Sequence, residues 1–349
     1  MGKRKSKTGM AGISRFVAVL NKDQAETQPT LTSLGNFTKS TAQRADYSNG
    51  DKELGKASVD GSNITSNLNQ AKTRKSAWFR YDVTGLVPFY NDAAQVPEHL
   101  LKYFSQRMRY FSLYDKHPGC LLDEEGWYSI TPERIADQIA ERCRCDVVLD
   151  AFCGVGGNTI AFAKTCERVI ALDTNPTRLA LARHNAHIYG VADRIEFIQA
   201  DYISFARAFL ASGSSSTPNM RRKIDVVFLS PPWGGPSYLS GSTVLSENED
   251  PDTTDPAVHP TYSLSSVQPI HGKDIFSLTR KITSNIAYYL PRNTNLSEIS
   301  DLLNGTDEQG NTIQLPGEQI EVEEEWMGDK MKALTCYFGG LAAGQEHLF

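Results

Sequence analysis

The stretch Asp146-Val147-Val148-Leu149-Asp150-Ala151-Phe152-Cys153-Gly154-Val155-Gly156-Gly157-Asn158 decides the fold. It joins a short apolar run, typical of a buried strand, to a glycine-rich loop. The residues after the loop predict a helix over 158–164 and a second strand over 168–173. A strand, a loop, a helix and a strand in this order are typical of a parallel sheet covered by helices.

The same alternation continues toward the C-terminus. Further elements are predicted over 175–189 (helix), 195–200 (strand), 224–230 (strand), 273–285 (helix) and 286–290 (strand). Two apolar runs, 319–323 and 332–338, flank Gly328-Asp329 and predict a hairpin. We therefore predict the α/β class, with a mostly parallel sheet closed by an antiparallel hairpin.

Composition divides the chain into three parts. Residues 1–76 contain 13 Lys and Arg against 6 Asp and Glu, or +7, so the remainder carries −12 to give the net −5. Because this basic tail is polar and has no sustained hydrophobic period, we expect it to be disordered. We expect a mainly helical extension over 77–140 and the α/β domain over 141–349, with loop insertions at 211–223 and 240–271.

Two helices are expected in the extension. Apolar residues recur at intervals of three and four over 99–110, which predicts one amphipathic helix. A second helix is predicted after Thr131, with Thr131 as the N-cap and Pro132 at the first helical position.

Composition also excludes some classes of protein. No stretch reaches the roughly 20 apolar residues of a membrane helix, and no secretion signal is recognisable. The six cysteines are too scattered for a disulfide framework, which favours a reducing compartment. Residues 2–7, Gly-Lys-Arg-Lys-Ser-Lys, fit a solvated charge run, a basic address or RNA-contacting arm, or a loose N-myristoylation pattern.

The glycine-rich loop predicts a cofactor site. Gly154 and Gly156 lie where the backbone must approach a ligand closely. A dinucleotide fingerprint needs its third glycine at position 159, which is Thr here, so a pyrophosphate-binding site is disfavoured. A site for S-adenosylmethionine (SAM), which has no pyrophosphate, is favoured instead.

Acidic residues at successive strand ends support the same site. Asp173 lies 23 residues after Asp150, where a carboxylate can take both ribose hydroxyls. Asp201 and Tyr202 follow the third strand, where they can bind the adenine amine and cover the ring. The alternative is that these acids cap helices or face water.

A proline-rich turn follows the fourth strand: Ser230-Pro231-Pro232-Trp233-Gly234-Gly235-Pro236. The prolines fix φ and leave carbonyls without ladder partners, and the tryptophan can stack on a planar ring. Amino-group methyltransferases use a similar polar-Pro-Pro-aromatic turn, with Asn or Asp where this chain has Ser230. The alternative is a stiffened turn with a core tryptophan.

Three stretches together resemble one family. They are 125–133 (Glu-Gly-Trp-Tyr-Ser-Ile-Thr-Pro-Glu), 150–159 and 228–236. The chain resembles the trimethylguanosine synthase family, whose members hypermethylate the 7-methylguanosine cap of small RNAs. The resemblance covers 78–341 apart from the two insertions. It implies a class I SAM-dependent methyltransferase with a seven-stranded Rossmann-like sheet and SAM as cofactor.

The resemblance also implies roles for individual residues. The residues implied in the SAM pocket, with the two loop glycines, are Phe111, Ser129, Thr131, Asp150, Gly154, Gly156, Asp173 and Asp201. Trp233 would stack on 7-methylguanine, with Ser230 and Pro231 at its amine edge. Asn185 and Tyr238 would lie nearby. Lys102 and Arg292 would meet cap phosphates, although Lys102 also fits a solvated helix face.

The chemistry of the base agrees with these roles. Methylation at N7 makes guanine cationic, and a tryptophan face attracts a cation by about 0.5–2 kcal/mol. The guanine N2 amine is a poor nucleophile, but alignment with a reactive methyl can lower the barrier by about 7–11 kcal/mol. We therefore expect Ser230, Pro231 and Trp233 to act by positioning rather than through a general base.

The resulting expectation is methylation of N2 in the caps of small nuclear and nucleolar RNAs, giving 2,2,7-trimethylguanosine. We expect a nuclear or nucleolar protein, with the cytoplasm as alternative, and ribonucleoprotein proteins as partners of the basic tail. The alternatives are an amino methyltransferase acting on rRNA or DNA bases and a non-catalytic scaffold. We expect no metal, because Cys143-Arg144-Cys145 lacks a second pair at metal spacing, and we expect Cys153 to be structural.

Overall fold

The computed structural model describes residues 17–20, 81–212, 223–234, 261–306, 312–314 and 318–342. The chain divides into two compact units, 1–22 with 81–349 and 23–80, and every described residue belongs to the first. No helix within the described ranges is long and apolar enough to cross a bilayer.

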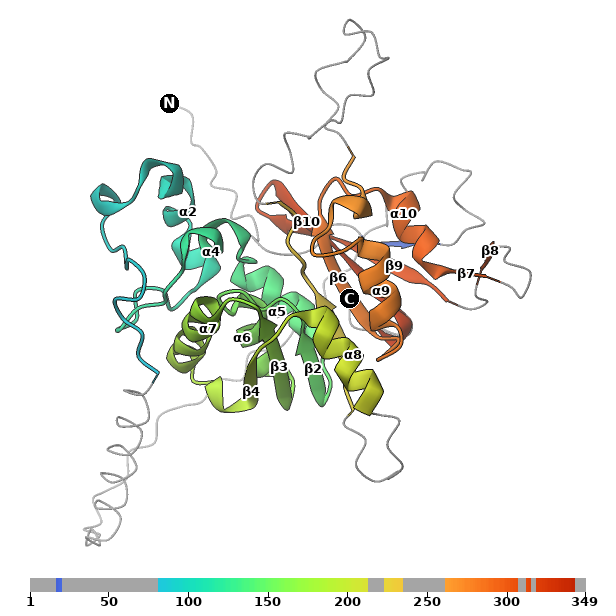
Figure 1. The fold of residues 1–349 in the computed structure, drawn as a ribbon. Helices are drawn as coiled ribbons and strands as arrows, with labels where there is room; N and C mark the ends of the chain where they lie inside the picture. Colours follow the sequence, from blue (N-terminus) through green and yellow to red (C-terminus); the bar gives the residue numbers. More distant parts are fainter. Residues whose placement is uncertain are drawn as a thin grey trace, which may run out of the picture. The chain divides into compact units, whose positions relative to one another are not determined.

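One eight-stranded sheet organises this unit, in the order β1-β9-β10-β6-β5-β2-β3-β4 (Figure 1). The five parallel strands are β2 (Val147–Asp150), β3 (Arg168–Asp173), β4 (Ile195–Gln199), β5 (Val226–Leu229) and β6 (Ile286–Pro291). β10 (Lys330–Phe338) runs antiparallel to β6 and forms a hairpin with β9 (Ile320–Met327). The predicted class, a mostly parallel sheet with an antiparallel hairpin, is confirmed.

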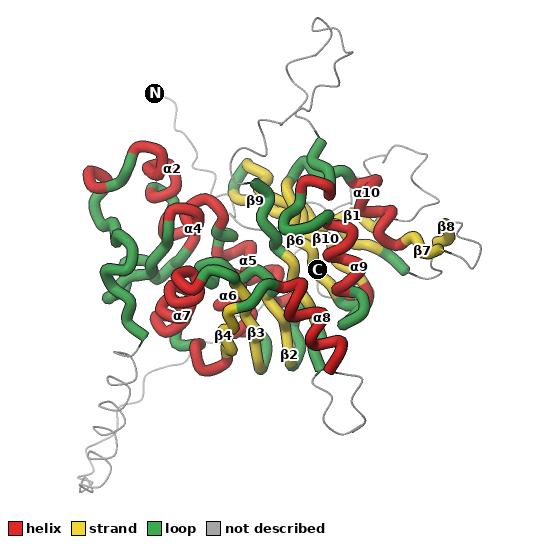
Figure 2. The backbone as a smooth tube through the Cα atoms, in the orientation of Figure 1, coloured by secondary structure: helices red, strands yellow, loops and turns green. Residues whose placement is uncertain are grey.

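Helices cover both faces of the sheet, and Figure 2 shows the strands running between them. The helices of the domain are α5 (Glu133–Arg142), α6 (Gly157–Thr165), α7 (Pro176–Tyr189), α8 (Tyr202–Ser212), α9 (Gly272–Thr279) and α10 (Leu296–Ser300). Alternate residues of β5 enter two cores: Phe228 packs with α5 and α6, whereas Leu229 packs with α8, α9 and α10. All four residues of β5 are buried, which is why this strand reads as a continuous apolar run.

The extension contains short helices. They are η2 (Ala93–Gln95), η3 (Glu98–Leu100), α2 (Leu101–Phe104), α3 (Arg107–Tyr110) and α4 (Glu124–Ser129). The single helix predicted over 99–110 is therefore wrong, because the chain breaks at Ser105 and Gln106. Both side chains donate hydrogen bonds to the Lys102 carbonyl, at 2.9 and 2.8 Å, and so compete with the helical ladder.

Two other helix boundaries differ from prediction. The N-cap of α5 is Pro132, without a side-chain cap, while the Thr131 hydroxyl accepts a hydrogen bond from Asn158 Nδ2 at 2.9 Å. The helix predicted over 273–285 ends at Thr279, and a turn follows before β6. Neither α8 nor α10 had been predicted.

The N-terminal tail contributes one strand, β1 (Val17–Leu20), antiparallel to the outer edge of β9. The predicted disorder of residues 1–76 is therefore wrong at these four residues. The seven predicted strands are all present in the sheet, and β1 is an eighth strand at its edge. An open sheet edge pairs readily with an apolar extended segment, which explains the addition. A separate two-stranded sheet joins β7 (Asn304–Thr306) and β8 (Thr312–Gln314).

Short 3₁₀ turns complete the described part. They are η4 (Ala192–Arg194), η7 (Leu264–Ser266), η8 (Asp301–Leu303) and η9 (Gly339–Leu341). The turn η7 lies inside the insertion predicted over 240–271, and Tyr262 before it forms a bridge with Thr294. The end of that predicted insertion is therefore ordered structure packed on the domain.

Candidate active site

The glycine-rich loop connects β2 to α6, and its two key glycines face different surroundings. Gly156 has φ +93° and caps α6, and a Cβ there would lie 3.1 Å from the Cβ of Ala182 on α7. Gly154 has φ +52°, and a Cβ there would meet no atom within 4 Å. Gly156 is therefore required for helix packing, whereas the open side of Gly154 leaves room for a ligand.

Asp150 ends β2 beneath this loop and is fully buried. Its Oδ2 accepts a hydrogen bond from the Thr159 hydroxyl at 2.5 Å, and its Oδ1 has no hydrogen-bond partner among the described residues. Burial raises the pKa of this carboxyl to about 7. A buried carboxylate oxygen without a donor is a suitable partner for a cationic or hydrogen-bonding ligand group.

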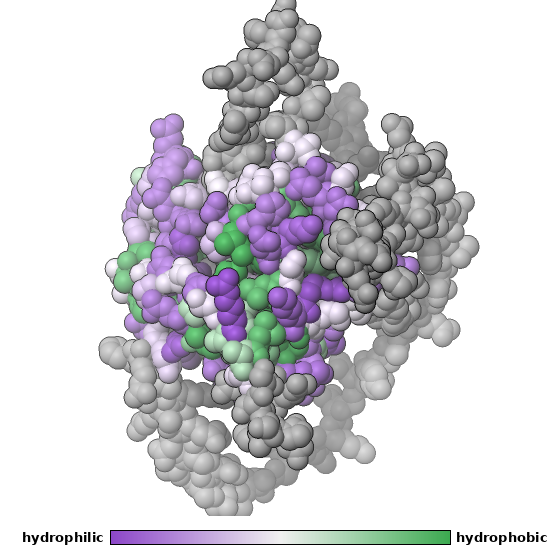
Figure 3. All heavy atoms as spheres, turned by 45° about the vertical axis from the view of Figure 1, so that its right-hand side comes forward, coloured by the Kyte–Doolittle hydropathy of each residue, from purple (hydrophilic) through white to green (hydrophobic). Residues whose placement is uncertain are grey.

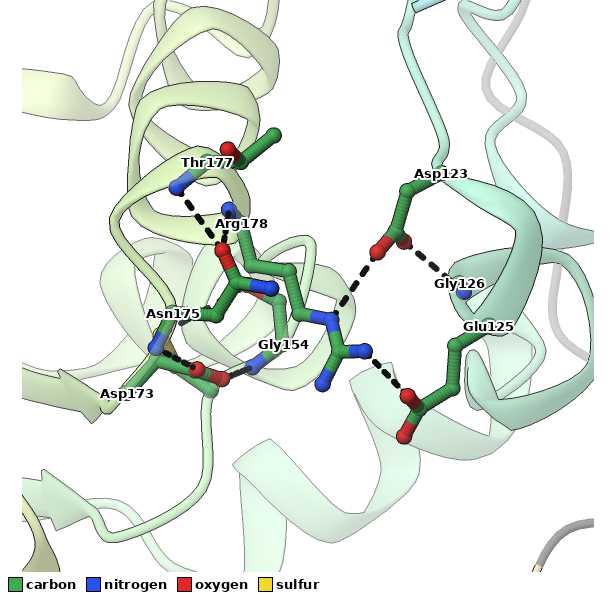
Figure 4. Close-up of polar contacts among 9 residues, drawn as sticks. Asp123, Glu125, Gly126, Gly154, Asp173, Asn175, Thr177 and Arg178 are labelled. Carbon is green, nitrogen blue, oxygen red and sulfur yellow. Dashed lines mark hydrogen bonds and ion pairs between the residues drawn. The ribbon is translucent and has the colours of Figure 1, made fainter.

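Asp173 ends β3, on the other side of the loop (Figure 4). Its two oxygens accept backbone hydrogen bonds from Gly154 at 3.0 Å and from Asn175 at 2.8 Å. Burial raises the pKa of Asp173 above its ordinary value. The two bonds hold the carboxylate against the loop, and each oxygen retains a lone pair for a ribose hydroxyl.

Asp201 makes a helix-capping hydrogen bond, which is the alternative to an adenine contact given in the sequence analysis. It is exposed and accepts a hydrogen bond from the Ser204 backbone N–H at 2.9 Å, in the first turn of α8. This bond is the main reason that the pKa of Asp201 is lowered. Tyr202 is buried, and its hydroxyl lies 2.6 Å from that of Thr279. The interpretation that Tyr202 covers the adenine ring is therefore wrong.

An ionic clamp holds the extension against the cofactor loop (Figure 4). Arg178 on α7 pairs with Asp123 at 2.9 Å and with Glu125, both at the start of α4. Asp123 also caps α4 by accepting from the Gly126 N–H at 2.9 Å. The sequence analysis missed this clamp, because its partners lie 53 and 55 residues apart.

The three extension residues predicted in the pocket lie in different surroundings. Phe111 is buried against Tyr189, with ring centroids 5.9 Å apart. Ser129 is exposed at the end of α4, and Thr131 is buried beside Asn158 at the start of α6. Of the three, Thr131 is the one that a hydrogen bond connects to the cofactor-loop helix.

Asn185 is held entirely by the protein. Its amide nitrogen donates to the carbonyls of Leu121, at 2.9 Å, and Val155, at 3.0 Å, while its oxygen accepts from the Leu121 N–H at 2.8 Å. The side chain is fully buried. Asn185 therefore joins the extension to the cofactor loop, and its position does not support the predicted substrate contact.

The turn after β5 lies against the cofactor loop. The Ser230 hydroxyl donates to the Phe152 carbonyl at 3.4 Å, and Pro231 is buried. Trp233 is half-buried and packs on Tyr289 of β6, with ring centroids 5.2 Å apart and planes at 35°. The fold thus brings the predicted catalytic residues next to the predicted cofactor pocket, and it adds Tyr289 beneath the indole.

Four basic side chains gather beside this turn. Ala333, directly after Lys332, pairs with Pro291, directly before Arg292, so these two basic residues lie near each other at the start of β10 and the end of β6. Burial, and then the charges of Lys330, Arg109 and Arg292, lower the pKa of Lys332. None of the four has an ion pair with a described residue. Such a like-charged group favours an anion, and the sequence analysis had identified only Arg292.

Lys102 is exposed on α2, with Nζ 4.8 Å from the ring centroid of Tyr103. The predicted residue Tyr238 lies outside the described residues. Cys153 is buried, and burial raises the pKa of its thiol far above the ordinary value, which fits a structural role. Within the described ranges, no three potential ligands are grouped to hold a metal ion.

Two hollows lie beside α8. Figure 3 shows a face of the molecule on which hydrophobic residues are exposed between hydrophilic ones. One hollow, of about 450 Å³, is lined by residues of α8 and α9, including Arg207 and Lys281. The other, of about 690 Å³, is lined by Phe205, Phe209 and neighbouring strand residues. Neither hollow is lined by a predicted site residue. The candidate active site is therefore located at the carboxyl ends of the strands and not in these hollows.

The strand-end pocket fits SAM. The open side of Gly154 leaves space above the loop, and Asp173 is oriented to accept hydroxyl groups. The buried Oδ1 of Asp150 remains to be satisfied. These three residues would hold the cofactor, which supplies a methyl group on a positively charged sulfur.

Comparison with known proteins identifies the family. Residues 145–341 match the family described as RNA cap guanine-N2 methyltransferase. Trimethylguanosine synthase of Schizosaccharomyces pombe is 37% identical over 210 residues, which cover 59% of this chain and 76% of that protein. Trimethylguanosine synthase of Saccharomyces cerevisiae is 32% identical over 206 residues, 58% of this chain and 57% of that protein.

Among solved structures, a SAM-dependent methyltransferase from Agrobacterium tumefaciens aligns with a TM-score of 0.36 at 15% identity, covering 60% of this chain and 63% of that chain. The family match, which spans more than half of the 349 residues, carries the assignment. The sheet is the class I SAM-dependent methyltransferase fold, and SAM is the cofactor. The chain therefore belongs to the RNA cap guanine-N2 methyltransferase family.

Proposed function

We propose that this enzyme converts the 7-methylguanosine cap of small nuclear and nucleolar RNAs into 2,2,7-trimethylguanosine. The observation that carries the proposal is the hydrogen bond from Ser230 to the Phe152 carbonyl, at 3.4 Å. It ties the Ser-Pro-Pro-Trp turn to the cofactor loop, where the methyl donor binds. The names of the two yeast relatives support the same product.

Trp233 selects a base that is already methylated at N7. Its indole rests on Tyr289, with centroids 5.2 Å apart, so the ring is supported from one side. The 7-methylguanine ring stacks on the indole, and its positive charge adds about 0.5–2 kcal/mol to the stacking. Unmethylated guanine lacks this charge and binds more weakly.

The reaction proceeds by positioning. The Pro231 carbonyl and the Ser230 hydroxyl accept the N2 hydrogens and direct the nitrogen toward the methyl group. Orientation of this kind supplies about 7–11 kcal/mol, so the turn needs no activated base. The N2 proton leaves to solvent after transfer, when the methylated amine is cationic and acidic.

The basic group beside the turn holds the phosphates that link the cap to the RNA. Lys332 lies at the start of β10, close to Arg292 after β6 and to Arg109 of α3, and the charges of both arginines lower its pKa. Cations close to one another repel, and a bound phosphate relieves that repulsion. Lys102, exposed on α2, stays a proposed second contact to the phosphates.

The proposal is tested by methyl transfer from labelled SAM to 7-methyl-GDP and, in parallel, to GDP. We expect label only in the methylated nucleotide, at N2, with dimethylated product at long times. Equal transfer to GDP, or transfer to unmethylated rRNA or DNA, would identify a general amino methyltransferase. SAM binding without any transfer would identify a scaffold.

We further propose that the basic start of the chain directs the protein to the nucleus and contacts ribonucleoprotein proteins. Residues 1–76 carry 13 basic against 6 acidic residues, which supports both roles. The test replaces Lys3, Arg4, Lys5 and Lys7 by serine and leaves β1 intact. We expect the fluorescently tagged variant to leave the nucleus, and an unchanged distribution would contradict the proposal.

A further inference from the structure

The fold gives the Cys143-Arg144-Cys145 motif a partner that its sequence spacing did not show. Cys166, directly after α6, lies with its Sγ 3.9 Å from the Sγ of Cys145, just before β2. Cys166 is buried, and Cys145 is partly buried. Two thiols therefore meet at the end of the sheet opposite the active site, with one of them accessible to solvent.

The two segments that carry these thiols are tied together. The Arg144 guanidinium donates to the Thr165 carbonyl at 3.2 Å, and the Thr165 hydroxyl donates to the Ala140 carbonyl at 3.1 Å. These bonds involve the residues immediately before each cysteine. The short distance between the two sulfurs is thus held by the fold.

The pair is chemically activated. The contact with Cys145 is the main reason that the pKa of Cys166 is lowered; burial acts in the opposite direction, and the Thr165 hydroxyl and the Arg144 guanidinium help to lower it. The same contact raises the pKa of Cys145. A thiolate is the reactive form in disulfide exchange, so the lowered pKa of Cys166 favours the reaction.

We propose that Cys145 and Cys166 form a redox-active dithiol that a small aliphatic disulfide converts to an intramolecular disulfide. One protein thiolate attacks the reagent, breaking its S–S bond and releasing one thiolate. The second protein sulfur then attacks this mixed disulfide, loses its proton and releases the other half of the reagent. Two electrons pass from the protein sulfurs to the reagent, which leaves as two thiols.

The other cysteines are unsuited to this reaction. Burial raises the pKa of Cys120, Cys143, Cys153 and Cys336, which keeps these thiols protonated. Cys143 is the nearest competitor, since its carbonyl oxygen lies 3.7 Å from the Cys166 sulfur. Its own side chain, however, is fully buried and out of reach of solvent. Selectivity for the 145–166 pair is therefore part of the proposal.

The bridge would join the far ends of the two elements that flank the cofactor loop. β2 begins at Val147, shortly after Cys145, and α6 ends at Thr165, directly before Cys166. Closing this chain segment reduces the entropy of the unfolded state. We expect the oxidised protein to melt roughly 5 °C higher than the reduced protein.

The test incubates the folded, full-length, reduced protein with oxidised glutathione and maps its disulfides by mass spectrometry without reduction. Trypsin cleaves after Arg144, Lys164 and Arg168, so we expect peptide 145–164 linked to peptide 165–168, two hydrogens lighter than their sum. Fragmentation then distinguishes Cys145 from Cys153.

Matched variants complete the experiment. Cys145→Ser and Cys166→Ser should each abolish the link and the rise in melting temperature, whereas Cys336→Ser should retain both. Dithiothreitol should reverse the change. A link through Cys143 or Cys153, or a link that forms only in urea, would overturn the proposal, as would the absence of any link in the folded wild-type protein.

Discussion

Asp173, on the cofactor side, and Arg292, on the proposed cap side, are held in opposite ways. Both oxygens of Asp173 accept backbone hydrogen bonds, and the ionic clamp of Arg178 closes the extension over the same loop. Arg292, in the turn after β6, lies close enough to Lys332 to lower its pKa, as do Arg109 and Lys330. On the cofactor side, hydrogen bonds and ion pairs within the protein hold the side chains in place. On the proposed cap side, basic side chains repel one another until an anionic ligand binds them.

The largest effect should come from the cap side. We expect Trp233→Ala to lower kcat/KM for 7-methyl-GDP roughly 100-fold, because stacking and the cation–π attraction are both lost. Trp233→Phe should retain part of the activity. Trp326→Ala, on β9, is the control and should change kcat/KM little. Full activity of Trp233→Ala would refute the stacking role.

On the cofactor side, Asp173→Asn should raise the Kd for SAM roughly 10–100-fold, because charge-assisted hydrogen bonds are lost. Calorimetry measures the change directly. Asp201→Ala separates the two interpretations of Asp201. As a helix cap it should lower the melting temperature and leave the Kd nearly unchanged, whereas an adenine contact would raise the Kd.

The cap-side charges should act through salt-dependent binding. We expect Lys332→Ala to raise the KM for 7-methyl-GDP roughly 10-fold and to weaken its dependence on salt, because one phosphate contact is lost. Without ligand the variant should melt no lower than the wild type, since repulsion with Arg292 is relieved. Lys273→Ala, exposed on α9, is the control. If ligand-free Lys332→Ala melted markedly below the wild type, the basic side chains would not repel one another in the free protein, contrary to the difference drawn here between the cofactor side and the cap side.

Asp150 is the exception on the cofactor side, because its burial raises its pKa to about 7. The unfolded carboxyl loses its proton near pH 4, while the folded one keeps it up to about pH 7. Stability from this group is therefore present below pH 4 and lost as pH rises toward 7.

Asp150→Asn removes this titration while keeping an acceptor for Thr159. Relative to wild type, its melting temperature should rise by roughly 5 °C between pH 5 and pH 8. Thermal melts of both proteins without SAM measure the difference. Parallel pH profiles would show that Asp150 is not protonated in the folded protein.

The smallest effect is expected at the clamp. Arg178→Gln should raise the KM for SAM about threefold and leave kcat unchanged, because partly exposed ion pairs are individually weak. Lys164→Gln is a matched control, since Lys164 also pairs with two acids, Glu133 and Asp137, but joins α6 to α5. An equal change in both variants would show a general loss of stability instead of positioning.

The sequence predicted the cofactor side better than the cap side. Asp150, Gly154 and Asp173 were identifiable because each lies at a strand end or in the turn that follows it. The basic group was mostly missed, because Lys332 and Arg292 are 40 residues apart in the sequence and come together only through the pairing of β10 with β6. The break at Ser105 was also missed, since hydrophobic spacing does not register side chains that bind a helix carbonyl.

The sequence by itself determined the seven strands of the domain, the cofactor loop and the turn before Trp233. Those features follow from local hydrophobic period and from backbone preferences of glycine and proline, which act within a few residues. Only the tertiary structure decided which distant groups meet. The Arg142 guanidinium donates two hydrogen bonds, of 2.8 and 2.7 Å, to the carboxylate of Glu321, 179 residues away. Cys145 before β2 contacts Cys166 after α6. Such contacts depend on how whole elements pack, which no short stretch of the sequence specifies.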